Sequence, residues 1–171
     1  PTSTTVVATG LAPLHRYFWR VTAANACGEA VSAVFDFTTA ALFCRAPGVA
    51  IPDGSAGGVN DGLTIVANGT LVDVDVTLRI NHVWVGDLKV TLSHGGAPIT
   101  LINRPGYTGS GFGCGKPNID VRVNDEGTDG NIETTCNASP PAIAGNRVGG
   151  DPPTTTLLAA FDGQLLAGTW T

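Results

Sequence analysis

Two segments in which apolar and polar residues alternate, at 71–80 and 87–93, constrain the fold of this chain most. Successive side chains of a β-strand point to opposite faces, so alternation of this length predicts two half-buried strands. The connector at 82–88 carries a His, a Trp and a Gly-Asp pair. The sequence therefore predicts two core strands joined by a short loop with distinctive side chains.

The rest of the chain consists of short Val, Ile, Leu and Thr runs separated by Gly, Pro, Asn and Asp. It contains 23 Gly and 11 Pro, and no window of eleven residues has the i, i+3, i+4, i+7 spacing of an amphipathic helix. This pattern predicts an all-β fold. The net charge of −5 argues against binding to nucleic acid or to anionic membrane surfaces. The longest apolar runs are too short for membrane insertion.

The four cysteines indicate disulfide bonds in a secreted, extracellular protein, because none belongs to a CxxC pair or has a histidine at zinc-ligand spacing. Residues 124–156 show no periodicity and predict one long loop, which a bond between Cys114 and Cys136 would hold in place, so we expect these two cysteines to pair. We also expect Cys27 and Cys44 to pair, although the strand at 31–39 would hold its ends about 25–30 Å apart. Since the sequence begins with Pro and contains no Met, we expect it to be part of a longer chain.

Residues 1–40 predict a separate unit built on a long hairpin with its loop at 25–29. A Leu-x-Pro-x-x-x-Tyr motif that ends at Tyr17 resembles the tyrosine corner of fibronectin type III domains, in which the Tyr hydroxyl bonds to backbone upstream. The resemblance implies the C-terminal strands of such a β-sandwich, followed by a linker at 41–46. About three strands cannot cover both faces. The missing strands must come from upstream domains of the same chain or from neighbouring subunits in a homo-oligomer.

Residues 47–171 form the second predicted unit, which carries a series of short motifs. In chain order these are Ile51-Pro52-Asp53, His82-x-Trp84-Val85-Gly86-Asp87-Leu88, Thr100-Leu101-Ile102-x-Arg104-Pro105-Gly106, Asn124-Asp125-Glu126-Gly127, Leu157 with Phe161-Asp162-Gly163, and Gly168-Thr169-Trp170. The series resembles the P domain, or P/Homo B domain, of proprotein convertases and bacterial subtilisin-like proteases. The resemblance implies a jelly-roll-like β-sandwich, truncated here at its last strand.

The marker residues of the connector are expected to be structural. Trp84 is large enough to close the open end of a sandwich, and Gly86 permits a turn that a Cβ would obstruct. Asp87 can accept hydrogen bonds from loop N–H groups, and His82 completes the motif. No Gly-x-Ser-x-Gly elbow is present. We therefore expect no catalytic residue in this chain, because serine-type endopeptidase chemistry in the family belongs to a separate domain.

Calcium is the ligand that fits the loops best, because carboxylates lie in or beside Gly-rich segments whose backbone carbonyls can supplement them. Solvated loop acids and turn caps are the alternative, since no EF-hand spacing is present. The candidate ligands are Asp53, Asp120, Asp125, Glu126, Asp129 and Asp162.

Two functions are consistent with these patterns. The first is a non-catalytic accessory module of a secreted bacterial protein, a subtilisin-like serine protease, that acts in stabilisation, maturation or substrate binding. The second is an extracellular structural or adhesive protein, or a filament subunit, completed by strands from neighbouring subunits.

Overall fold

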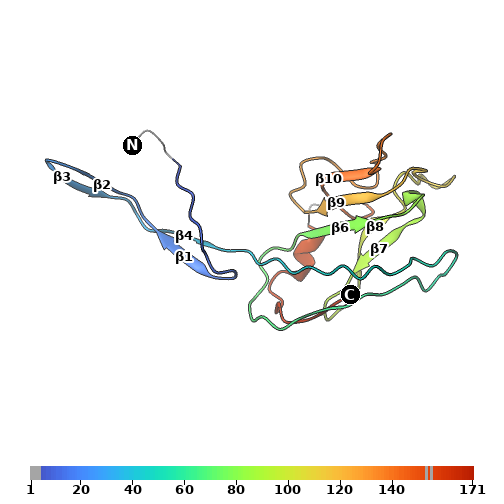
Figure 1. Cartoon of the computed structure of the whole chain (residues 1–171), viewed down its shortest axis with the longest axis horizontal. Coiled ribbons are helices and arrows are strands. Elements are labelled where there is room, and N and C mark those ends of the chain that lie inside the picture. The colour runs from blue at the N-terminus through green and yellow to red at the C-terminus, as the bar shows by residue number, and fades with distance from the viewer. Residues whose placement is uncertain (1–4, 153, 155) are drawn as a thin grey trace. The chain divides into compact units, whose positions relative to one another are not determined.

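The computed structural model describes residues 5–152, 154 and 156–171, and the chain divides into two compact units, Pro1–Ala46 and Pro47–Thr171. Strands make up nearly all of the regular structure (Figure 1), which confirms the predicted all-β class. The helical elements of the described residues are two 3-10 turns, η1 (Val85–Asp87) and η2 (Leu158–Phe161). In the same residues no helix is long and apolar enough to cross a membrane.

The first unit is the long hairpin that the sequence predicts, drawn in blue in Figure 1. Two antiparallel ladders follow one another along it, and at their junction Ser32 N donates a hydrogen bond to Val21 O at 2.8 Å. The Ser32 hydroxyl in turn accepts a bond from Val21 N at 2.9 Å. The paired strands are β1 (Arg16–Trp19) with β4 (Phe35–Thr38), and β2 (Thr22–Asn25) with β3 (Gly28–Val31).

Four aromatic rings share one face of the β1–β4 ladder, because the register sets Tyr17 opposite Phe37 and Trp19 opposite Phe35. The rings stack in pairs, with centroids 5.8 Å apart in the first pair and 4.8 Å in the second. Even so, Trp19 and Phe35 are each 48% exposed. A two-stranded ribbon has no second layer to cover such a face, and residues 5–46, which the structure describes, contain no buried side chain.

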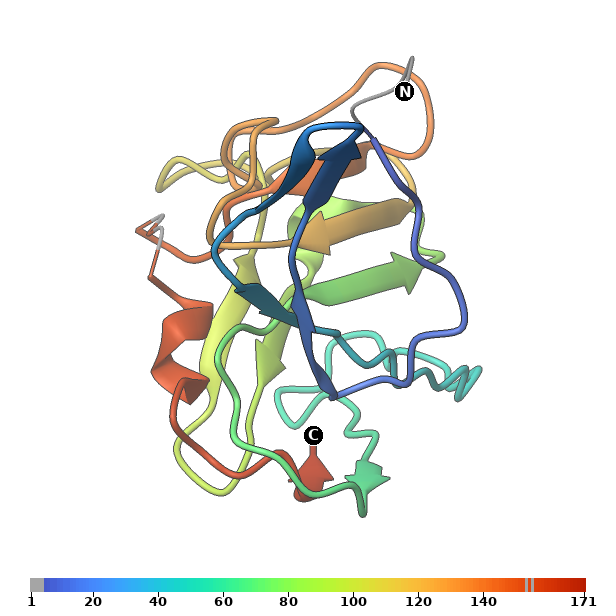
Figure 2. The same ribbon diagram turned by 90° about the vertical axis from the view of Figure 1, so that its left-hand side faces the viewer.

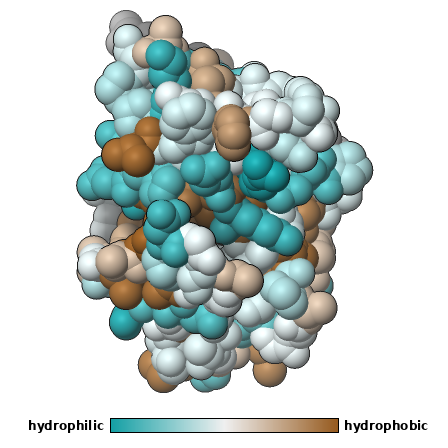
Figure 3. Space-filling model, turned by 90° about the vertical axis from the view of Figure 1, so that its right-hand side faces the viewer, coloured by the Kyte–Doolittle hydropathy of each residue, from teal (hydrophilic) through white to brown (hydrophobic). Residues whose placement is uncertain are grey.

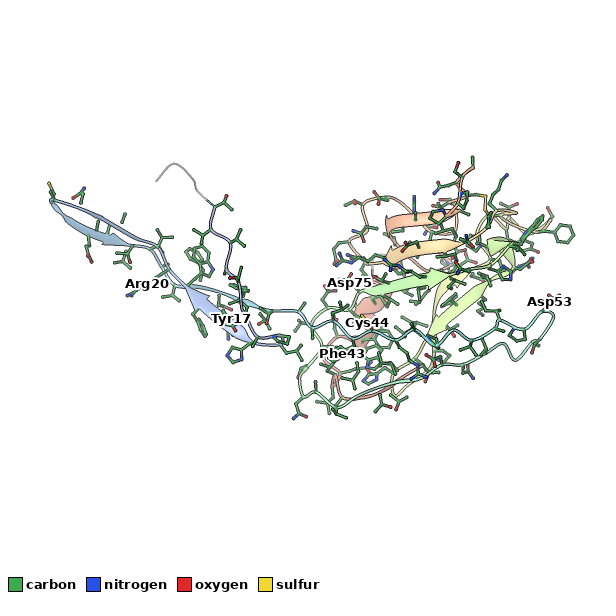
Figure 4. All side chains as sticks on the ribbon, in the orientation of Figure 1. Tyr17, Arg20, Phe43, Cys44, Asp53 and Asp75 are labelled. Atoms are coloured by element: carbon green, nitrogen blue, oxygen red, sulfur yellow. A yellow bond between two sulfur atoms is a disulfide. The ribbon has the colours of Figure 1, made fainter. Side chains whose placement is uncertain are left out.

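The turn before β1 is fixed by hydrogen bonds between its backbone and two side-chain hydroxyls, those of Tyr17 and Thr39. The Tyr17 hydroxyl accepts a bond from Ala12 N at 2.7 Å, and Tyr17 is labelled on this part of the hairpin in Figure 4. Thr39 reinforces the turn, since its hydroxyl donates to Ala12 O at 2.6 Å and accepts from His15 N at 2.9 Å. Tyr17 thus makes the upstream backbone contact that the sequence motif implies.

The second unit contains three separate groups of strands. A three-stranded sheet has the order β10-β9-β6, in which β9 pairs antiparallel with β6 and parallel with β10. The other two groups are antiparallel pairs, β7–β8 and β5–β11. The β7–β8 strands run at a steep angle to those of the three-stranded sheet (Figure 2), as in a two-layered sandwich. The strands are β5 (Leu63–Ile65), β6 (Val76–Ile80), β7 (Lys89–Leu92), β8 (Ile99–Asn103), β9 (Ile119–Val123), β10 (Ile143–Arg147) and β11 (Gly168–Trp170).

The hydrophobic core of this unit gathers residues from each group of strands. In β9 the odd-numbered residues are buried, whereas Asp120 and Arg122 between them are exposed. The face shown in Figure 3 is mixed, with hydrophilic residues around small separate apolar patches. The innermost side chains are Val85, Leu101, Ile102, Val121, Val123, Ile132, Ile143 and Leu158.

The strand expected at 31–39 is interrupted, since β3 ends at Val31 and β4 begins at Phe35, and two predictions for the second unit are also wrong. The strand expected at 71–80 begins only at Val76, because Leu71 forms backbone hydrogen bonds with Gly163 and Gln164 instead of a regular ladder. The segment from 124 to 156, expected to be one long loop, contains strand β10. That strand has the sequence Ile-Ala-Gly-Asn-Arg, which lacks alternation, and it is held in place by its parallel pairing with β9.

Candidate functional site

Gly86 in the connector between β6 and β7 is required by the close passage of another loop. Its N–H donates a hydrogen bond to Cys114 O at 3.0 Å. A Cβ at this position would lie 2.6 Å from Phe112 O and 2.7 Å from Gly113 C, and closer still to Cys114 N. The expectation that a Cβ at Gly86 would be obstructed is confirmed. The obstructing atoms belong to the backbone of residues 112–114, which cannot rotate out of the way as a side chain could.

Trp84 does not close the sandwich, so its predicted role as a buried plug is wrong. Its side chain lies across the outside of the same loop, with ring carbons 2.8 Å from where a Cβ of Gly115 would stand. The indole N–H donates to Phe112 O at 2.8 Å, and 39% of the residue remains exposed. Val85, which is fully buried, and Leu88 are the connector residues that enter the core.

His82 and Asp87 differ in how they serve the connector. His82 Nδ1 accepts a hydrogen bond from Trp84 N at 3.1 Å, and the His82 backbone bonds to Asn118 through both its N–H and its carbonyl. Asp87 is exposed, and among the described residues its carboxylate accepts no hydrogen bond. The expected role of Asp87 as an acceptor is wrong, because the turn is closed by its own N–H donating to Trp84 O at 3.2 Å.

The predicted disulfide between Cys114 and Cys136 is present, with an S–S distance of 2.05 Å. Two backbone hydrogen bonds lie close to it. Cys114 N donates to Pro105 O at 2.7 Å, and Gly106 N donates to Glu133 O at 2.7 Å. The disulfide and these bonds join the 104–115 loop, on which Gly86 and Trp84 pack, to the turn at 131–136.

The expected bond between Cys27 and Cys44 is absent, and both are free and exposed. Cys27 lies in the turn between β2 and β3, whereas Cys44 lies beyond the end of β4. The extended chain through β3 and β4 carries the two thiols apart, at about 3.3 Å per residue. The prediction was wrong because the linker does not fold back along the hairpin.

Asp125 is an internal structural acid. It is buried, and its carboxylate accepts hydrogen bonds from Leu158 N and Ala159 N at 3.0 Å each. These are N–H groups at the start of η2, which have no partner within the turn itself. Asp125 therefore caps η2 and has little capacity left for a metal ion.

The other predicted calcium ligands do not converge. Asp120 pairs with Arg79 at 3.2 Å, and the Asp129 carboxylate accepts a bond from Asn146 N at 2.7 Å. Asp53 lies at the tip of a loop, as Figure 4 shows. In the part of the chain that the structure describes, no three His, Cys, Asp or Glu side chains are grouped to hold a metal ion. The remaining exposed candidates are Asp53, Glu126 and Asp162.

Glu133 is an unusual acid that sequence reasoning missed. Burial raises its pKa to about 7, and the charge of Asp151 acts in the same direction, while a hydrogen bond from the Asn103 N–H opposes them. Its Oε1 accepts that bond at 2.7 Å. Its Oε2 is buried and has no hydrogen-bond partner among the described residues. No motif marks Glu133, because the residues that create its environment are distant in sequence.

The histidine rings make contacts of a structural kind. His94 is buried and stacks on Trp170, with centroids 4.1 Å apart, while its Nε2 lies 2.7 Å from Leu165 O. His15 packs against Tyr17, with centroids 5.1 Å apart. None of the ring contacts found among the described residues is with a serine or cysteine, as a nucleophile–base pair would need.

No family model, curated protein or solved structure matches the chain. The interpretation of these loops therefore depends on their own geometry.

Proposed function

We propose that the chain is a non-catalytic accessory region of a secreted bacterial protein, a subtilisin-like serine protease, and that residues 47–171 are its P-domain-like module. The module would stabilise the protease, assist its maturation or help bind its substrate. The order of the motifs in the sequence supports this proposal. So does the structural use of the marker segment, because Gly86 and Trp84 hold the loop at 112–115.

The intact secreted polypeptide provides the test. A fluorophosphonate probe, mapped by mass spectrometry, should label a serine outside residues 1–171. Deleting 47–171 from the full-length gene should lower the yield of mature enzyme or shorten its half-life on heating. A full-length gene without a protease domain would overturn the proposal. So would a deletion that leaves secretion, maturation, half-life and turnover unchanged.

A second candidate function is favoured by the aromatic face of β1–β4. Trp19 and Phe35 are each 48% exposed and Phe37 is 41% exposed, on a ribbon of two strands. Strands donated by neighbouring subunits would cover this face in a filament or adhesive assembly. Sedimentation of native material, purified without denaturant, distinguishes the two functions, because a strictly monomeric full-length protein is incompatible with the second.

A further inference from the structure

Two carboxyl groups from distant segments meet at Asn103, the last residue of β8. The backbone N–H of Asn103 donates to Glu133 Oε1 at 2.7 Å. Its side-chain Nδ2 donates to Asp151 Oδ2 at 2.8 Å. Glu133 belongs to the turn that precedes Cys136, and Asp151 follows β10. One residue therefore holds both acids, each through a different N–H group.

The second carboxylate oxygen of Glu133, Oε2, is the atom of this group that lacks a hydrogen bond within the described part of the chain. Oε2 is buried without a hydrogen-bond partner among the described residues. Leaving a charged oxygen without a donor in a buried position is strongly unfavourable. A proton taken from solvent onto Oε2 removes the charge and makes this atom a donor. The raised pKa of Glu133, about 7, agrees with this geometry.

The charged groups of the surrounding segments do not offset the negative charge of Glu133. Asp151 has the same sign and raises the pKa of Glu133 further. The Arg104 guanidinium lies over the Tyr107 ring, 3.9 Å from its centroid. Lys89 is opposite Asn103 in the β7–β8 ladder, but it is exposed, and no ion pair joins it to Glu133. Protonation is thus the remaining route by which Glu133 becomes neutral.

Glu133 also supports the disulfide-linked loop. Its carbonyl oxygen accepts the hydrogen bond from Gly106 N at 2.7 Å, and Cys136 of the same turn is bonded to Cys114. Repulsion between two ionised carboxylates at Asn103 would therefore act on the turn that anchors the 104–115 loop. The same loop carries the backbone against which Gly86 packs.

We propose that Glu133, Asn103 and Asp151 form a pH-sensitive clasp, which fastens the 131–136 turn to the end of β8 when Glu133 is protonated and loosens it when Glu133 is ionised. A group whose folded pKa is raised stabilises the fold fully below its unfolded pKa, here 4.5, and loses that effect as the pH rises through about 7. The clasp is therefore closed in mildly acidic solution and weakened above neutrality. This inference does not depend on the proposed function.

Nuclear magnetic resonance on the whole chain, with a chelator present, tests the clasp directly. The carboxyl carbon of Glu133 should titrate with a midpoint near 7, and Asp151→Asn should lower that midpoint. The rate of amide hydrogen exchange at Gly106 is divided by the rate at Val121 in β9, and in this ratio the intrinsic effect of pH on exchange cancels. This ratio should rise about tenfold from pH 5 to pH 8 in the parent chain and stay constant in Glu133→Gln.

Glu126→Gln is the matched control, because Glu126 is an exposed acid nearby in sequence, and it should behave as the parent chain does. A Glu133 midpoint near 4.5 would overturn the proposal. A Glu133→Gln chain that keeps the pH-dependent exchange ratio would overturn it equally. If that variant does not fold, the carboxyl titration of the parent chain and of Asp151→Asn decides the question.

Discussion

Replacing Gly86 by alanine places a methyl group where the backbone of residues 112–114 passes. The new Cβ would lie 2.6 Å from Phe112 O and 2.7 Å from Gly113 C. Real Cβ atoms do not approach backbone atoms so closely, so either η1 or the loop must move. The loop has little freedom, because Cys114 is fixed by its disulfide and by its N–H bond to Pro105 O.

The expected destabilisation can be worked out from the contacts that such a movement disturbs. Forcing one extra methyl group into a packed site costs about 1–3 kcal/mol. If the loop retreats, the bonds from Gly86 N to Cys114 O and from Trp84 Nε1 to Phe112 O are also weakened, at about 1 kcal/mol each. We therefore expect Gly86→Ala to lower the free energy of unfolding by about 3–5 kcal/mol.

Urea unfolding followed by tryptophan fluorescence measures this loss. Gly96→Ala is the matched control, because a Cβ at Gly96 meets nothing within 4 Å, and it should change stability by less than about 0.5 kcal/mol. Reducing the disulfide frees the loop and should narrow the difference between Gly86→Ala and the parent chain. If Gly86→Ala unfolds at the same urea concentration as Gly96→Ala, the close passage of the two backbones is refuted.

Three further variants test other parts of the second unit. Glu133→Gln should be more stable than the parent at pH 8 by about 1.5 kcal/mol and equal to it below pH 4.5. If the whole rise of the Glu133 pKa to about 7 were converted into free energy, the difference would be about 3.4 kcal/mol; we expect a smaller value because part of the side chain is exposed to solvent. Urea titrations in which both chains lose stability with pH to the same extent would contradict this prediction. Asp125→Ala should lose about 2 kcal/mol through two unsatisfied N–H groups, while Glu126→Ala stays within about 0.5 kcal/mol, and similar melting of both would argue against the cap. Trp84→Ala should destabilise the fold by about 1–2 kcal/mol and Trp170→Ala, which removes a buried side chain, by about 3–5 kcal/mol. If calorimetry shows the larger loss for Trp84→Ala, then Trp84 is a core residue and this assignment is wrong.

Features that depend on neighbours in sequence could be predicted from the sequence. The hairpin of the first unit and strand β7 both follow from alternating side chains and flanking turn residues. The glycine at position 86 follows from the sequence only in part, because the pattern indicates a tight connector, whereas the backbone that excludes a Cβ belongs to residues 112–114, which are distant in sequence. The Cys114–Cys136 disulfide was foreseen because it closes one local loop.

Features that depend on distant partners could not be predicted in this way. Strand β10 has no alternation and exists through its parallel pairing with β9, after a connection that contains Cys136, whose disulfide partner Cys114 precedes β9. Trp84 is partly exposed because its ring lies on the outer side of the 112–115 loop, and the sequence does not indicate that side. Glu133 owes its raised pKa to burial and to Asp151, which is remote in sequence. None of these relations leaves a spacing pattern in the sequence.

The pairing of β5 with β11 has a consequence for how this unit folds. Leu63, near the start of the unit, is opposite Trp170, so the ladder cannot form until more than a hundred intervening residues are in place. During synthesis, the apolar side of β5 therefore stays exposed to solvent while the middle of the unit folds. Contacts between such distant residues fold slowly and leave edges open to aggregation in the meantime. Damage to the last strand would then appear first as poor yield of folded protein, before any change in the finished fold.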